Sequence, residues 1–110
     1  MKITKEFPGL VESSWCFRFN GSIETEESIE IDLGNKWLVV SGSLRAGWGI
    51  EAGWGIEAGL FIKCRGVLKL AFNLFAGTAT WKKAEGEDLV VEAKRIEGDV
   101  KSGNVRLLTK

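Results

Sequence analysis

Histidine and tyrosine are absent from this sequence of 110 residues, which also contains only one proline and two cysteines. Without histidine there is no Ser-His-Asp triad, no Cys-His pair, no histidine general base and no zinc site with histidine ligands. These absences exclude several common classes of active site before any motif is considered.

The two cysteines, Cys16 and Cys64, lie far apart in the sequence and are not spaced like metal ligands. No run of about 18 apolar residues is present, and the charged N-terminus, MKITKEFPGL, does not resemble a secretion signal. We therefore expect two reduced, mostly buried thiols in a protein that neither enters a membrane nor binds a metal. A disulfide or a redox pair is the alternative.

Charge is balanced, with 15 Lys and Arg residues against 15 Asp and Glu residues. A net charge of zero argues against a protein that coats DNA and against an acidic DNA mimic, so we do not expect direct binding to nucleic acid. Apolar residues make up 45% and charged residues 27% of the chain, as in ordinary soluble domains. At this length we expect one domain, residues 1–110, with one modest core.

An internal repeat dominates the middle of the chain. The hexapeptide GWGIEA occupies residues 47–52 and again 53–58, and a degenerate copy, GLFIKC, follows at 59–64. The same register extends further in both directions. Large apolar residues recur every six positions at Leu38, Leu44, Ile50, Ile56, Ile62, Leu68 and Leu74.

Within each repeat, apolar residues alternate with glycine or charged residues, which is the pattern of a β-strand. The repeated glycines also oppose a helix, because each costs about 1 kcal/mol there relative to alanine. Short strands joined by regular bends indicate a β-solenoid, in which each coil pairs with its neighbours. Three sides of six residues give a coil of about 18 residues, each side about 20 Å long. Residues 22–107 would then supply roughly five coils.

This all-β, solenoid-like fold makes specific pairings. It stacks Leu38, Ile56 and Leu74 on one face and Ile50 under Leu68. It also places Trp54 over Phe72 and pairs Glu51 with Lys69 on the surface. The large Trp48 and Trp54 do not suit a narrow interior, so either the coil is wider or these rings leave it at the glycine corners. A twisted antiparallel meander or a small barrel is the alternative fold.

The flanking segments complete the predicted organisation. We expect an N-terminal cap at residues 1–21 that includes a strand over Trp15–Asn20, and a turn at Gly34-Asn35. The hexapeptide-repeat core spans 22–81 and a polar loop spans 82–88. The C-terminal strands within 89–110 are Leu89–Ala93, Arg95–Gly98 and Asn104–Leu107.

No catalytic constellation emerges from the sequence, so we expect neither an enzyme nor a cofactor. Glu51 and Glu57 could be paired carboxylates, but their repeat position is shared with Arg45, Lys63 and Lys69, which favours a charged surface ladder. Ser41 and Ser43 lack a base, as do the cysteines. The glycines of GWGIEAG have no following Lys-Ser/Thr or helix, so they do not form a phosphate-binding loop.

Tryptophans beside basic residues are the remaining functional candidates, because such groups form protein hot spots and stack on nucleobases. We expect one patch of Trp48 and Trp54 with Arg45, Lys63 and Arg65. We expect another of Trp81 with Lys82 and Lys83. The alternative is that these tryptophans only pack in the core or at corners. The high apolar content also favours a homo-oligomer.

The run AGWGIEAGWGIEAG, at Ala46–Gly59, and the later LFAGTATW, at Leu74–Trp81, resemble small phage and prophage proteins with tandem IEAG-type hexapeptides and a downstream FAG…W element. The resemblance covers about half the chain and implies a phage or mobile-element origin and a bacterial cytoplasmic location, but no reaction. By analogy we expect an inhibitor of a bacterial defence system, of the anti-CRISPR type, that docks on and blocks a host protein complex. The alternatives are a sponge that sequesters a small nucleotide signal and a structural assembly subunit.

Overall fold

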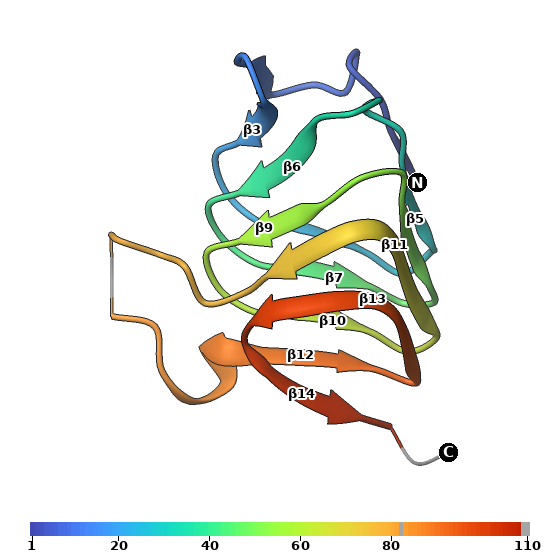
Figure 1. Ribbon diagram of the computed structural model, residues 1–110, viewed down its shortest axis with the longest axis vertical. Coiled ribbons are helices and arrows are strands. Elements are labelled where there is room, and N and C mark those ends of the chain that lie inside the picture. Colours follow the sequence, from blue (N-terminus) through green and yellow to red (C-terminus); the bar gives the residue numbers. More distant parts are fainter. Residues whose placement is uncertain (82, 109–110) are drawn as a thin grey trace.

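The chain forms a three-sided β-solenoid, in which successive coils lay short strands along the sides of a triangular stack (Figure 1). The computed structural model describes residues 1–81 and 83–108. The molecule measures 36 × 28 × 24 Å. The predicted all-β solenoid fold is therefore confirmed, and the antiparallel meander is not formed, because the paired strands of the three sides run parallel.

Each side of the stack is a set of strands from successive coils. Side 1 contains β3 (Cys16–Phe19), β6 (Trp37–Val40), β9 (Ile56–Ala58) and the ends of β11 (Val67–Phe75) and β13 (Arg95–Ser102). Side 2 contains β4 (Ile23–Thr25), β7 (Leu44–Ala46), β10 (Ile62–Cys64), β12 (Val90–Ala93) and β14 (Asn104–Leu107). Side 3 contains β1 (Lys2–Ile3), β5 (Ile29–Ile31), β8 (Ile50–Ala52) and the beginnings of β11 and β13.

The central coils have the predicted length of 18 residues. Leu38 pairs with Ile56 and Ile56 with Leu74 on side 1, and Ile50 pairs with Leu68 on side 3. Glu51 lies opposite Lys69, as the repeat predicts. Side 2 has five strands in the order β14-β12-β10-β7-β4, in agreement with the expected five coils.

The core is a set of columns formed by the inward residue of each strand. The seven large residues of the six-residue register, from Leu38 to Leu74, are all at most 1% exposed. The small Ala46, Ala52 and Ala58 face inward two positions later and are also buried. This alternation of large and small side chains fills a narrow triangular interior without room for an indole ring.

The tryptophans of the two clean repeats therefore lie outside, at the glycine corners. Trp48 is 65% exposed at the corner between sides 2 and 3, and Trp54 is half-buried at the corner between sides 3 and 1. Of the two solutions that the sequence left open, the structure shows the second. The coil stays narrow and the rings leave it.

The ends of the chain differ from the expected boundaries of the repeat. The parallel stack already includes β1, which pairs with β5, and β3, which pairs with β6. The expected cap strand is thus a member of the stack. The residues that cover its edge are those of β2 (Leu10–Glu12), which runs antiparallel to β3.

Two insertions lengthen the regular coil. The predicted turn at Gly34-Asn35, with Gly34 at φ +66°, adds three residues, so that Ile29 pairs with Ile50 across 21 positions. A longer insertion follows Phe75 at the corner between sides 1 and 2. It includes the predicted polar loop and a short 3₁₀ helix, Gly86–Leu89, and it extends away from the stack (Figure 1).

Candidate functional site

The three candidate tryptophans occupy three different corners of the triangle, one at each. Trp48 lies between sides 2 and 3, Trp54 between sides 3 and 1, and Trp81 in the long insertion between sides 1 and 2. The expectation of one patch containing both Trp48 and Trp54 is therefore wrong. Six residues separate them, and this is one full side of the coil, about 20 Å.

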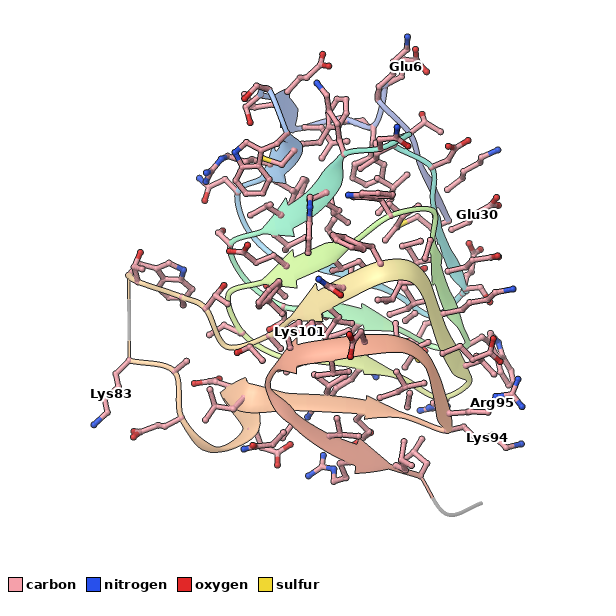
Figure 2. All side chains as sticks on the ribbon, in the orientation of Figure 1. Glu6, Glu30, Lys83, Lys94, Arg95 and Lys101 are labelled. Carbon is pink, nitrogen blue, oxygen red and sulfur yellow. The ribbon has the colours of Figure 1, made fainter. Side chains whose placement is uncertain are left out.

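The corner at Trp48 brings together an exposed indole and two basic residues. The backbone N–H groups of Arg65 and Gly66 both donate to the Trp48 carbonyl oxygen at 3.1 Å, and the Lys94 N–H donates to the Gly66 carbonyl at 2.9 Å. Arg65 and Lys94 are exposed, and neither side chain makes an ion pair or hydrogen bond with the described residues. Figure 2 shows Lys94 projecting away from the stack here. We call Trp48, Arg65 and Lys94 the Trp48 corner.

The other two basic residues expected in this patch are engaged in a charged ladder on side 2. Outward residues of successive strands alternate in sign along this ladder, in the order Glu24, Arg45, Lys63, Glu92 and Arg106. Lys63 lies 2.7 Å from Glu87 and over the ring of Phe61, and Arg45 lies 4.0 Å from Glu26. With Arg65 they surround a shallow hollow of about 270 Å³.

Glu87 is the centre of the strongest ion-pair network. It accepts hydrogen bonds from Arg106 at 2.9 and 3.0 Å and from Lys63 at 2.7 Å. These bonds, from Arg106 first, lower the pKa of Glu87 from 4.5 to about 2, and they raise the pKa of Arg106. The network ties the 3₁₀ helix of the insertion to β10 and β14 on side 2.

Trp54 belongs to an aromatic cluster rather than to a basic patch. Its ring stacks on Phe72, and Trp37 packs against both Phe72 and Phe75 at centroid distances of 5.7 and 5.6 Å. Sequence reasoning missed Trp37, because the three extra residues of the Gly34 turn remove it from the hexapeptide register.

Trp81 lines a pocket of about 440 Å³ on side 1, beside the insertion. Its indole N–H donates to the Ser41 carbonyl oxygen at 3.0 Å, although the ring is 61% exposed. Other lining residues include Arg18, Val39 and Glu57. Lys83, expected beside Trp81, is exposed on the insertion and points away from the stack (Figure 2), while Lys82 lies outside the described residues.

Sequence reasoning missed the residues of this pocket other than Trp81. Glu57 was considered only as a partner for Glu51, but the two carboxylates lie on different sides of the stack and cannot act as a pair. Arg18 carried no signal, since it precedes the clear repeat. The 21-residue register would have placed it opposite Val39 and two coils from Glu57.

The cysteines are both free and buried, in agreement with the expectation of reduced thiols. Burial raises the pKa of Cys64 to about 11, so this thiol is a poor nucleophile at neutral pH. Within residues 1–81 and 83–108, no cluster of three or more Cys, Asp or Glu is arranged to hold a metal ion. No helix in the described part of the chain is long and apolar enough to cross a membrane.

Comparisons with protein-family models, with curated proteins and with solved structures each found no match. The geometry of the three corners is therefore the basis on which function is argued below.

Proposed function

We propose that the chain is a non-catalytic binding protein that docks on a host protein complex through the Trp48 corner. The observation that carries the proposal is the 65% exposure of Trp48 beside two basic side chains, Arg65 and Lys94, that have no ionic partner among the described residues. Exposing an indole to water is unfavourable, and tryptophan and arginine are the residue types most enriched at binding hot spots.

The rigidity of the corner supports docking. The Trp48 carbonyl is held by two backbone N–H groups of the next coil, and the next corner follows directly through Gly66 and Lys94. A side chain presented on such a backbone is already ordered before binding, so association loses less conformational entropy than it would with a flexible loop. The adjoining hollow between Arg45, Lys63 and Arg65 offers a place for an acidic or carbonyl group of the partner.

The target that we propose is a component of a bacterial defence system, which the protein inhibits by steric blocking. The IEAG-type repeat at Ala46–Gly59 and the LFAGTATW element support a phage or mobile-element origin, and hence action in the bacterial cytoplasm. Small proteins of that origin without a catalytic set commonly act by binding host machinery.

We also propose that two copies associate end to end through β14. Val105 and Leu107 continue the inward columns of Val91 and Ala93, yet they are 49% and 54% exposed, because no described strand lies beyond them. An open strand edge with an uncovered core column favours pairing with an identical edge about a two-fold axis. Leu107→Asp is expected to convert a dimer to a monomer in light scattering, with the exposed Val11→Asp at the opposite end as control. A monomeric wild-type protein would contradict this arrangement.

The docking proposal is tested by capture from bacterial lysate. Tagged wild-type protein should retain a stoichiometric host complex that mass spectrometry identifies, and Trp48→Ala and Arg65→Ala should lose it while remaining folded. Phage should then form plaques on a host defended by the captured complex only when the wild-type protein is expressed. Retention by both variants would place the docking surface elsewhere, and a protein without any partner would contradict the proposal.

A further inference from the structure

The pocket beside Trp81 lies at the largest interruption of the repeat. Ile62 pairs with Val91, 29 residues later, whereas Leu44 pairs with Ile62 after only 18. All of the extra residues follow Phe75, at the corner between sides 1 and 2, because the two preceding sides keep their six-residue spacing. Insertions into a repeat often build the binding face of a solenoid.

The floor of the pocket is a column of outward side chains on side 1. Arg18 lies opposite Val39 in β6, and Val39 lies opposite Glu57 in β9. Two strand spacings separate Arg18 from Glu57, about 10 Å. Val39 is only 9% exposed between them. The floor thus offers a cation at one end, an anion at the other and an apolar surface in the middle.

The wall of the pocket comes from the insertion. The hydrogen bond from the Trp81 indole to Ser41 fixes the ring at its edge and leaves it 61% exposed. The Thr78 hydroxyl lies 3.3 Å from both Glu57 Oε2 and the Ala58 carbonyl oxygen, which holds the insertion against β9. Glu57 Oε1 accepts no hydrogen bond from the described residues, and Arg18 has no ionic partner among them.

These features define the chemistry of a ligand. It needs a flat aromatic ring to stack on Trp81, an anionic group for Arg18, and adjacent hydrogen-bond donors for a carboxylate, which only accepts. Among the nucleobases, guanine alone presents two adjacent donors, N1–H and the N2 amino group, on its pairing edge. Adenine and cytosine place a ring acceptor beside their amino group, and the carboxylate would repel it.

We infer that this pocket binds a free guanine nucleotide, with the base stacked on Trp81, its N1 and N2 donors on Glu57 and its phosphate on Arg18. A cavity of about 440 Å³ lies within the range of small-ligand sites and holds one mononucleotide. The site is at a different corner from Trp48, so it is independent of docking. It gives the chain a capacity to sequester a nucleotide as well as to bind a protein.

Titration calorimetry with guanosine 5′-monophosphate tests the inference. One molecule should bind per chain, and guanosine and adenosine 5′-monophosphate should each bind about tenfold more weakly or worse. Arg18→Ala should reduce the affinity for the nucleotide to that for guanosine. Glu57→Gln should remove the preference for guanine over adenine. Trp81→Phe should keep part of the stacking if Trp81→Ala fails to fold.

Arg65→Ala and Trp48→Ala are the matched controls, because they remove an exposed arginine and an exposed tryptophan outside the pocket. Both should bind the nucleotide like the wild type. The inference is overturned if no heat is released at millimolar nucleotide, if both nucleotides bind equally, or if Arg18→Ala has no effect. Partner capture by Arg18→Ala reports separately on docking, so failure of one proposal is distinguishable from failure of the other.

Discussion

The indole of Trp54 stacks on the ring of Phe72 one full coil later, with 4.7 Å between the ring centroids and 26° between the ring planes. This contact lies outside the core, at the corner between sides 3 and 1, and it joins two successive coils. It shows that the coil has the same length at the surface as in the interior.

Removing either ring should destabilise the fold, and the two losses should not be additive. A stacked aromatic pair contributes about 0.5–1.5 kcal/mol beyond its area burial. A double-mutant cycle of Trp54→Ala and Phe72→Ala, followed by chemical denaturation, should give a coupling free energy in that range. Purely additive effects would show that the rings do not interact in solution.

The glycines at equivalent positions of the repeat should differ sharply in their tolerance of alanine. A Cβ at Gly47 would lie 2.1 Å from the Glu26 carbonyl oxygen, whereas at Gly53 its nearest neighbour would be 3.8 Å away. Gly47→Ala should therefore lower the free energy of unfolding by about 1–3 kcal/mol, as overpacking does. Gly53→Ala should stay within about 0.5 kcal/mol of the wild type. Equal effects of the two substitutions in urea denaturation would contradict the different geometry of these corners.

Stability should fall in acid as Glu87 is protonated. Its folded-state pKa of about 2 lies below the ordinary value of 4.5, so its hydrogen bonds to Arg106 and Lys63 stabilise the fold above pH 4.5. That contribution is lost as the pH falls from 4.5 toward 2. Thermal unfolding across this range should show a smaller decline for Glu87→Gln than for the wild type. Glu85→Gln, in the same insertion, is the control and should behave like the wild type. Parallel curves for all three proteins would exclude a role for Glu87.

Neither cysteine should react in the folded protein. With a pKa of about 11, Cys64 is about one thousandth thiolate at pH 8, and both thiols are buried. Iodoacetamide should therefore label no cysteine in native protein and two in guanidinium, as measured by mass spectrometry. Rapid labelling of one site in native conditions would indicate local opening of its strand.

Much of the fold follows from the hexapeptide alone. Inward residues six positions apart fix both the side length and the pairing of Ile50 with Leu68, because any other register would expose the apolar columns. The strands outside the clear repeat, β1 and β3, could not be assigned in this way, since the Gly34 turn shifts their register by three residues.

The functional sites were only partly predictable, and for a geometric reason. A period of six places Trp48 and Trp54 at equivalent positions in the sequence but at different corners of a three-sided coil. The Trp81 pocket depends on the path of an irregular insertion, which no periodicity specifies. Its other charged residues, Arg18 and Glu57, meet only because two coils of different length separate them.

The most direct test of the account compares Trp48→Ala with Trp54→Ala for binding to the captured host complex. The two tryptophans occupy the same place in identical hexapeptides, so the substitutions are matched in chemistry and local sequence. If the Trp48 corner is the docking surface, Trp48→Ala should weaken binding by about 30-fold or more, the effect of losing a hot spot. Trp54→Ala should be less stable but bind with the affinity of the wild type. Unchanged binding by Trp48→Ala, or an equal loss in both variants, would contradict the central claim.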